Sequence, residues 1–387
     1  MDSFVFKGSK KLRKGVTTGT CAAAASAAAA RMLLSGERSR NINVTLPGGN
    51  EIILEVESTE VLDTGVRCSI RKYAGDDPDI TDGMLICSFA EAFRPSNDSP
   101  FGSKVIIEGG DGIGHVTRIG LDQPIGSAAI NSVPRKMIEE AVLKEMLRTD
   151  FDGCLKVTIS IPGGREAAAR SFNPRLGIEG GLSVLGTTGI VEPMSDEAIV
   201  ETFKLQLRQR YLEDGGYLVA TPGNYGIDFI QKELGLDAEK AVMCSNFIGQ
   251  AIDIACGIGA EGLLLCGHIG KMCKLASGIM NTHSKVADGR QEIFCCCALL
   301  AGSDRETAIS MLDCATTEEA IAILRNKDLL YPFMDILMER IERRLSLRAG
   351  SKMKIAAVVF ANDRKCLGKT SLADEMIQII RNQQGKV

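Results

Sequence analysis

The sequence predicts an α/β protein of two domains, an N-terminal α+β domain over residues 1–200 and a Rossmann-like parallel-sheet domain with a helical C-terminal part over residues 201–387. The chain has 387 residues, enough for two to three domains of ordinary size. Strand-like runs with a helix between two of them gather in the first half, as in α+β domains. In the second half, short apolar runs each end in a loop of small residues and precede a helical stretch, as in a parallel sheet.

An Ala-rich run over residues 21–34 predicts the first long helix, because Ala has the highest helix propensity. Hydroxyl residues at 17–20 precede it and are suited to cap a helix start. Basic residues over 7–14 give this region a superficial likeness to a signal peptide. Since Ala anchors poorly in membranes and no apolar run approaches the roughly 20 residues of a membrane span, we expect a cytoplasmic protein that does not bind membranes.

Alternating apolar and polar residues over 41–70, broken by a turn at 47–50, predict the first strands. A helix is predicted from Pro134 to Arg148, where apolar residues recur at intervals of three and four. Further strands are predicted at 84–92, 103–110 and 155–164.

Three consecutive apolar runs in the second half share one design. They are GYLVATPGNYG (216–226), AVMCSNFIG (241–249) and GLLLCGHIG (262–270). A polar residue stands in each loop, and the intervals 246 − 224 and 268 − 246 are both 22 for Asn224, Asn246 and His268. In parallel sheets ligands bind outside the carboxyl ends of the strands, so we expect these three side chains to line one edge. The alternative is that the runs are buried strands with ordinary turns.

The chain after His283 is predicted to be mostly helical, with an amphipathic helix over 329–347. One more strand is predicted at 354–362, followed by a last helix over 371–381.

Composition excludes several classes of function. Lys plus Arg number 45 against 49 Asp plus Glu, so the net charge of −4 provides no global field for holding a nucleic acid, and we expect none to bind. The 13 cysteines include no C-x-x-C pair, which favours reduced thiols in a cytoplasmic protein. With only three histidines besides, we expect no metal held by the protein.

Four aspartates crowd the segment AGDDPDITD at 74–82. Crowded carboxylates bind hard cations or raise one another's pKa, and Pro78 fixes the backbone between Asp77 and Asp79. We therefore predict a catalytic role for Asp77 and Asp79. The alternative is a solvated turn whose carboxylates bond their own backbone.

A Gly-rich segment at 109–114 follows an apolar strand. Its glycines would let the backbone approach a ligand, with Asp111 contacting the substrate, although the spacing does not fit G-x-G-x-x-G. A tight turn between strands is the alternative.

Two segments carry Thr-Thr-Gly, one beginning at Thr17 and Thr18 and the other formed by Thr187, Thr188 and Gly189. Hydroxyls with glycine N–H groups suit a carboxylate or a sugar hydroxyl. We assign the first pair to the substrate and the second segment to the cofactor, with capped helix starts as the alternative.

His268 stands in the third strand-end loop near Lys271, and His283 follows in NTHSK. An imidazole at a ligand edge can transfer a proton near neutrality, which makes His268 a candidate catalytic residue. A histidine that is merely hydrogen-bonded in a packed loop is the alternative.

Several segments together resemble the cobalt-precorrin-5B C-1 methyltransferase family of anaerobic cobalamin biosynthesis. They are RKGVTTGTCAAAA (13–25), AGDDPDIT (74–81), GGDGIGHVT (109–117), FNPRLGIEGGLSVLGTTGIVEPMS (172–195), GNYG (223–226) and GHIGKMCKLASGIMNTHSKVADGR (267–290). The resemblance implies S-adenosylmethionine-dependent methyl transfer to C-1 of a corrin precursor, giving cobalt-precorrin-6A, with cobalt present only as part of the substrate. It carries over no catalytic residues.

Local chemistry therefore supplies the remaining candidates. For the cofactor these are Asn224, Gly226, Asn246 and Gly270, and for the substrate carboxylates and ring they are Arg175, Lys271 and His283. Two other functions remain open from the residues alone, a nicotinamide-dependent oxidoreductase and a non-catalytic corrinoid-binding protein. The expected partners are a small-molecule corrin precursor and further copies of the chain in a homo-oligomer.

Overall fold

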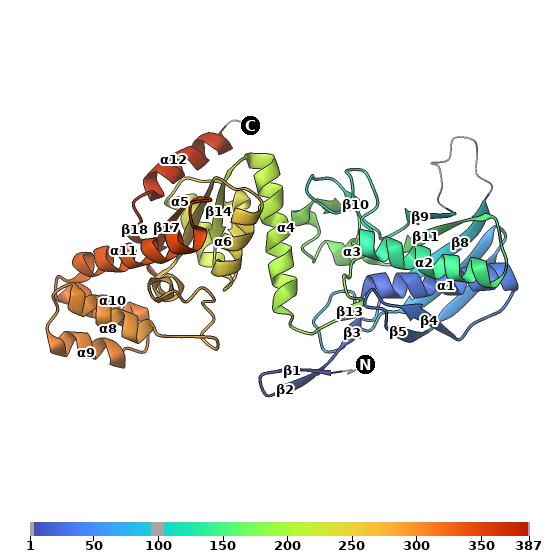
Figure 1. The fold of residues 1–387 in the computed structure, drawn as a ribbon, viewed down its shortest axis with the longest axis horizontal. Coiled ribbons are helices and arrows are strands. Elements are labelled where there is room, and N and C mark those ends of the chain that lie inside the picture. Colours follow the sequence, from blue (N-terminus) through green and yellow to red (C-terminus); the bar gives the residue numbers. More distant parts are fainter. Residues whose placement is uncertain (1–3, 94–103, 386–387) are drawn as a thin grey trace. The chain divides into compact units, whose positions relative to one another are not determined.

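The computed structural model describes residues 4–93 and 104–385, which form a mixed α/β protein (Figure 1). The mixed α/β class predicted from the sequence is confirmed. The chain divides into two compact units, Met1–Ser195 and Asp196–Val387, which we call the N-terminal unit and the C-terminal unit.

The N-terminal unit begins with a hairpin and a long helix, and strands dominate the rest. Its elements are β1 (Phe4–Lys7), β2 (Lys10–Arg13), β3 (Gly15–Val16), α1 (Thr18–Ser35), β4 (Asn41–Thr45), β5 (Glu51–Glu55), β6 (Ser58–Leu62), β7 (Gly65–Arg71), β8 (Leu85–Phe93), β9 (Val105–Gly109), β10 (His115–Val116), α2 (Ser132–Arg148), β11 (Cys154–Ser160), α3 (Gly164–Ala168), η1 (Pro174–Leu176), β12 (Ile178–Glu179) and β13 (Ile190–Val191).

A five-stranded sheet of order β6-β7-β8-β11-β9 forms the centre of this unit. Helix α1 packs against β7 and β8 and against α2. Every residue of α1 from Thr18 to Ala30 is buried, because its small Ala side chains let the helix lie close to its neighbours. The Ala-rich run is therefore a core helix of the unit.

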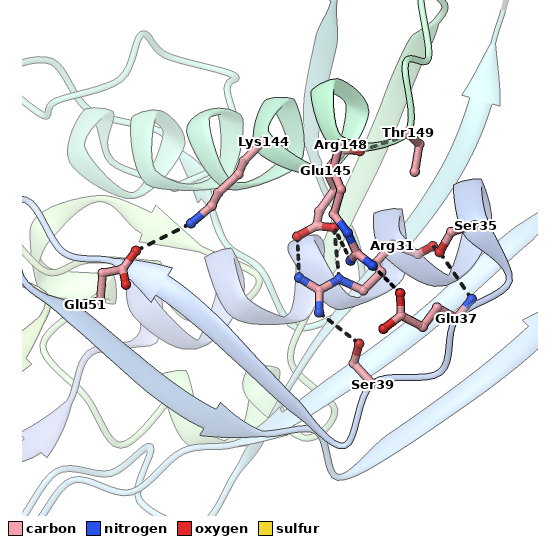
Figure 2. A network of polar contacts seen from close by, with 9 residues as sticks. All are labelled: Arg31, Ser35, Glu37, Ser39, Glu51, Lys144, Glu145, Arg148 and Thr149. Atoms are coloured by element: carbon pink, nitrogen blue, oxygen red, sulfur yellow. Dashed lines mark hydrogen bonds and ion pairs between the residues drawn. The ribbon is translucent and has the colours of Figure 1, made fainter.

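A polar network joins α1 to α2 at their C-terminal ends (Figure 2). Arg31 donates two hydrogen bonds to the buried carboxylate of Glu145 and a third to Ser39. Arg148 contacts Glu145 and also pairs with Glu37. The only buried charge of the network thus has two cationic partners, as a buried carboxylate requires.

The two ends of the N-terminal unit meet. Strand β3 pairs with β13 in antiparallel register, Val16 opposite Ile190. At the start of α1, the Thr18 hydroxyl both donates to the Leu185 carbonyl and accepts from the Leu185 N–H, at 3.1 Å each. Segments about 170 residues apart in sequence are thereby held together.

The C-terminal unit alternates strands and helices and then continues as a run of helices. Its elements are α4 (Asp196–Asp214), β14 (Tyr217–Thr221), α5 (Asn224–Lys232), η2 (Ala238–Lys240), β15 (Val242–Met243), α6 (Ile248–Gly257), β16 (Gly262–His268), α7 (Ile269–Met272), η3 (Cys273–Ser277), α8 (Arg290–Leu300), α9 (Arg305–Asp313), α10 (Thr317–Asn326), α11 (Leu330–Ala349), β17 (Lys354–Phe360), β18 (Cys366–Lys369) and α12 (Ala373–Gln384).

Its sheet has the order β15-β14-β16-β17-β18, with all neighbours parallel except the last pair. Side chains of the strands alternate between two cores. One core includes residues of α4, α6 and α11, and the other includes residues of α5 and α12 (Figure 1). Helices on both faces explain why the strands are almost continuously apolar.

Most of the predicted elements have a counterpart in the structure, several strands are shorter than predicted, and helix α4 and the N-terminal hairpin were not predicted. The run at 241–249 is predicted to be a strand that ends in a loop, and the strand part is short, Val242–Met243. The strand expected at 103–110 is Val105–Gly109, and residue 103 lies outside the described residues.

Candidate functional site

A cavity of about 820 Å³ lies in the C-terminal unit at the carboxyl ends of the parallel strands. It is lined by the turn 221–226 after β14, by Asn246 after β15, by residues at 268–271 after β16, and by Phe360 and Asn362 after β17. Residues 282–284 and 316–318 complete the wall. The volume falls within the roughly 300–1,000 Å³ of small-molecule sites.

The three polar residues spaced by 22 come together here. Asn224, Asn246 and His268 all line this cavity, as do Gly226 and Gly270. The reason is topological, since β14, β15 and β16 are parallel neighbours and their carboxyl ends share one edge of the sheet. The structure therefore places these side chains as the spacing predicts, whereas their roles in binding or catalysis stay predictions.

The turn after β14 brings a helix start to the cavity. Helix α5 begins at Asn224. Its N-cap residue is Gly223, so no side chain caps the start of the helix. A Cβ on Gly226 would lie 1.8 Å from Thr221 Oγ1, so only glycine lets α5 approach the end of its strand so closely. The backbone N–H groups of the first turn carry the positive end of the helix dipole, which favours an anionic ligand group.

The imidazole of His268 is held on three sides. Its Nδ1 accepts a hydrogen bond from the Gly270 N–H at 3.1 Å, and its Nε2 lies 3.2 Å from Glu318 Oε1. The Phe360 ring contacts it edge-on. Because Nδ1 accepts a hydrogen bond, the ring hydrogen is on Nε2, which donates a hydrogen bond to Glu318. To accept a proton from a ligand, His268 would have to release one of these two bonds.

Two lysines at the cavity have different surroundings. Lys271 donates to the Pro222 carbonyl at 2.6 Å, and burial lowers its pKa from the usual value. The Lys274 side chain is only 1% exposed and donates to the carbonyls of Thr282 and Ala287, at 3.1 and 2.9 Å. Lys274 thus fixes the loop on which His283 stands, while Lys271 has one uncharged partner and is suited to bind a carboxylate.

Glu318 is a cavity residue that the sequence did not reveal. It is the second residue of α10, and its Oε1 accepts hydrogen bonds from His268 and from the Asn362 N–H, the latter at 3.0 Å. The sequence from Thr316 to Glu319 has the capping-box pattern of a helix start, which was the one available signal. That signal does not say which strand the helix start lies beside.

Asp77 and Asp79 lie in the N-terminal unit. Asp79 accepts a hydrogen bond from the buried ammonium of Lys72 at 2.6 Å and two more from Thr81, at 2.6 and 2.8 Å. Asp77 accepts one from the Met194 N–H at 2.9 Å. These contacts hold the acidic turn in the unit, and the structure does not place either residue at the cavity described above. Their catalytic role stays a prediction.

The two Thr-Thr-Gly segments bind one another within the N-terminal unit. Thr17 caps α1 by accepting from the Thr20 N–H at 3.2 Å, and the Thr20 hydroxyl donates to the Gly189 carbonyl at 2.7 Å. Thr17 and Thr18 are buried, and Thr18 bonds Leu185. The hydroxyls of the first segment are thus engaged in holding α1.

The remaining predicted residues of this unit are exposed, except Gly189, which is buried. Thr187 and Thr188 lie at the surface, and Thr188 bonds only the backbone two residues on, among the interactions of the described residues. Asp111 pairs with Arg165 at 3.3 Å, and Arg175 is also exposed. Their assignment to cofactor and substrate stays a prediction.

Across residues 4–93 and 104–385, no group of three or more His, Cys, Asp or Glu side chains is arranged to hold a metal ion. Within the same ranges, none of the helices has the length and apolar character needed to cross a membrane.

Comparison with known proteins identifies the family. One family model, CbiD, matches residues 5–193, and a second, the CbiD C-terminal domain, matches residues 281–371. A relative from Ruminiclostridium cellulolyticum named cobalt-precorrin-5B C(1)-methyltransferase is 44% identical over 363 residues, covering 94% of this chain and 92% of the relative. The chain belongs to the CbiD family. The family resemblance seen in the sequence is confirmed.

Other CbiD relatives match over almost the whole chain. Proteins of the same name from Alkaliphilus metalliredigens and Thermoanaerobacter sp. are 38% and 40% identical, covering 99% and 95% of this chain and 99% and 98% of their own lengths. A crystal structure of a cobalamin biosynthesis protein (CbiD) from Archaeoglobus fulgidus is 26% identical, with a TM-score of 0.39 and coverage of 73% of this chain and 86% of that one. In this CbiD chain, the C-terminal family match includes Glu318 and Phe360 of the cavity wall.

Proposed function

We propose that this protein is an S-adenosylmethionine-dependent C-methyltransferase that methylates C-1 of cobalt-precorrin-5B, giving cobalt-precorrin-6A in anaerobic cobalamin biosynthesis. The observation that carries the proposal is the near full-length similarity to relatives with that name, up to 44% identical over 94% of the chain. Cobalt enters only as part of the corrin substrate.

We assign the cavity of the C-terminal unit to the cosubstrate and the reacting edge of the ring. Four parallel strands, with helices on both faces and a cavity at the carboxyl ends, support a Rossmann-like site. Its donors fit the group, since the uncapped start of α5 and the Asn224 and Asn246 amides suit carboxylate and hydroxyl oxygens. Thr187, Thr188 and Gly189 of the N-terminal unit are a separate proposal for cofactor binding.

The chemistry asks little covalent work of the protein. S-adenosylmethionine supplies a sulfonium-bound methyl group that is already activated, and the sulfur keeps the electron pair of the broken bond. The residues of this chain have to hold the ring carbon close to that methyl group and in line with it, which accounts for much of the rate of such a transfer. Lys271 is suited to anchor a carboxylate side chain of the corrin precursor, with Arg175, Asp111, Thr17, Thr18 and His283 as further proposed substrate contacts.

We further propose a cytoplasmic location and a homo-oligomeric state. All 13 cysteines are free, which supports a reducing compartment. Light scattering on the purified chain tests the oligomeric state.

The decisive experiment incubates the purified chain with S-adenosylmethionine and the corrin precursor and follows the ring by mass spectrometry. We expect a gain of one methyl group together with release of S-adenosylhomocysteine. Nicotinamide cofactors serve as controls for the alternative oxidoreductase and should neither bind nor turn over. Tight corrin binding without methylation would instead favour the non-catalytic corrinoid-binding protein.

A further inference from the structure

The charges around the cavity are unevenly distributed. Lys271, Lys274 and Arg290 supply its cationic side chains. Among the described residues that line it, Glu318 alone carries a carboxylate. The cavity wall is partly withdrawn from water, and a carboxylate in such a place costs free energy unless it has a partner. The position of Glu318 therefore suggests a function.

Two of the cations already have partners. Arg290 makes two hydrogen bonds to the carboxylate of Asp288, at 2.7 and 2.8 Å, and Lys274 is satisfied by two backbone carbonyls and lies 3.7 Å from the same carboxylate. Neither cation forms an ion pair with Glu318 among the interactions of residues 104–385. Arg290 and Lys274 therefore do not neutralise the charge of Glu318.

The Glu318 carboxylate is held in a fixed orientation. Its Oε1 accepts two hydrogen bonds, from His268 Nε2 and from the Asn362 N–H, which come from the ends of two neighbouring strands. Its Oε2 has no hydrogen-bond partner in the part of the chain that the structure describes. The side chain is 29% exposed, so this oxygen remains available to a ligand. Such anchoring lowers the entropic cost of binding a charged group.

We propose that Glu318 binds the α-ammonium group of S-adenosylmethionine and so marks the cosubstrate end of the cavity. This inference rests on the proposed function. The two ligands differ in charge, since the corrin precursor carries carboxylates that Glu318 repels, whereas the amino-acid end of the cosubstrate carries an ammonium group that it attracts. His268 acts as a positioning residue for Glu318, through the bond from its Nε2.

Calorimetric titration of the full chain tests the assignment with three ligands. S-adenosylmethionine and S-adenosylhomocysteine both carry the ammonium group, and only the first carries the sulfonium charge. 5′-Methylthioadenosine lacks the amino-acid end altogether. The test variant is Glu318→Gln, which keeps an oxygen that can accept from His268 and Asn362. The matched control is Glu319→Gln, on the next residue of α10 and outside the cavity wall.

We expect Glu318→Gln to weaken the binding of both S-adenosylmethionine and S-adenosylhomocysteine by about tenfold or more, as for loss of a charge-assisted hydrogen bond. The affinity for 5′-methylthioadenosine should stay within about twofold, and Glu319→Gln should match the unmodified chain for all three ligands. A loss confined to S-adenosylmethionine would place Glu318 at the sulfonium and overturn the ammonium assignment. Unchanged affinities, or an equal loss for all three ligands, would also overturn it. If the unmodified chain fails to bind S-adenosylmethionine, the proposed function itself fails.

Discussion

Arg31 of α1 and Glu145 of α2 face one another in a two-pronged ion pair, with Nη2 2.6 Å from Oε1 and Nε 2.9 Å from Oε2 (Figure 2). The Glu145 side chain is 3% exposed. The pair joins α1 to α2. Without Arg31, the buried Glu145 carboxylate would lose its main partner and would still carry its desolvation cost.

We predict that Arg31→Met lowers the free energy of unfolding by about 2–4 kcal/mol, measured by chemical denaturation. Lys136→Met is the matched control, because Lys136 pairs with Glu140 on the exposed face of α2 at 3.7 Å. That change should cost no more than about 0.5 kcal/mol. Equal effects of the two variants would show that Glu145 tolerates burial without Arg31.

Alanine substitutions at Gly83 and Gly112 distinguish the cost of backbone strain from the cost of crowding. Both have a positive φ, +74° and +73°. A Cβ on Gly112 would lie 1.9 Å from the Ile161 carbonyl oxygen, whereas one on Gly83 would meet nothing within 4 Å. We predict that Gly83→Ala costs about 1 kcal/mol of stability and Gly112→Ala about 3 kcal/mol or more, in the same denaturation assay. Similar costs at both positions would mean that the close approach at Gly112 relaxes without penalty.

Asp79 should make the stability of the protein depend on acidic pH. Burial raises the pKa of Asp79, but the Lys72 ammonium and the hydrogen bonds from Thr81 outweigh it, so the pKa lies below the usual 3.8. A carboxyl whose folded-state pKa is lowered stabilises the fold above its unfolded-state pKa, and this contribution is lost as the pH falls through the folded-state pKa. We predict that Asp79→Asn costs about 2 kcal/mol at neutral pH and progressively less as the pH falls below about 4.

Asp77→Asn provides the comparison within the same turn. An amide oxygen can still accept from the Met194 N–H, so stability should change by no more than about 0.5 kcal/mol. Methyl transfer is measured on both variants. A lower turnover at unchanged stability would support the catalytic role predicted for Asp77, and full activity of both variants would remove both residues from the site.

Substrate binding should weaken at alkaline pH because Lys271 loses its charge. Burial lowers its pKa below the usual 10.5, so the cation is lost at a lower pH than on an exposed lysine. If Lys271 anchors a corrin carboxylate, KM for the corrin precursor rises as the pH increases through that lowered pKa. Lys271→Gln should raise KM about tenfold at neutral pH and flatten this dependence. A KM that rises with pH equally in the variant would assign the pH dependence to another group.

His268→Ala is predicted to lower turnover by about 10²-fold or more if the imidazole handles a proton. Glu318→Gln helps to interpret the result, since it perturbs only one of the two polar contacts of the ring. Turnover of His268→Ala that is unchanged across pH 6 to 8 would assign His268 to packing and positioning.

The sequence predicts the edge of the cavity better than its walls. Asn224, Asn246 and His268 could be placed together because the carboxyl ends of consecutive parallel strands must share an edge. Glu318 could not, because it lies 50 residues after His268 in the chain and depends on where α10 packs. Only long-range packing decides that position.

Glycine-rich segments were harder to interpret. The sequence leaves a ligand-binding loop and a tight turn open for the segment of Gly112, and its neighbours in the structure are the backbones of Ile161, Gly164 and Gly181. A glycine in a sequence shows that something approaches closely and does not show whether that is a ligand or another part of the chain. The paired Thr-Thr-Gly segments illustrate the same limit, since they resemble two binding loops and in fact contact one another.

The pairing of β3 with β13 has a consequence for synthesis of the protein on the ribosome. Strand β3 gains its strand partner, and the hydroxyls of Thr18 and Thr20 gain their backbone partners, only when residues 185–191 have been made. Closing a loop of this length is entropically costly and slow compared with local contacts. These contacts at the start of α1 therefore stay unmade through most of the translation of the N-terminal unit. We expect chaperone dependence and aggregation on truncation to be highest for chains ending shortly before residue 185.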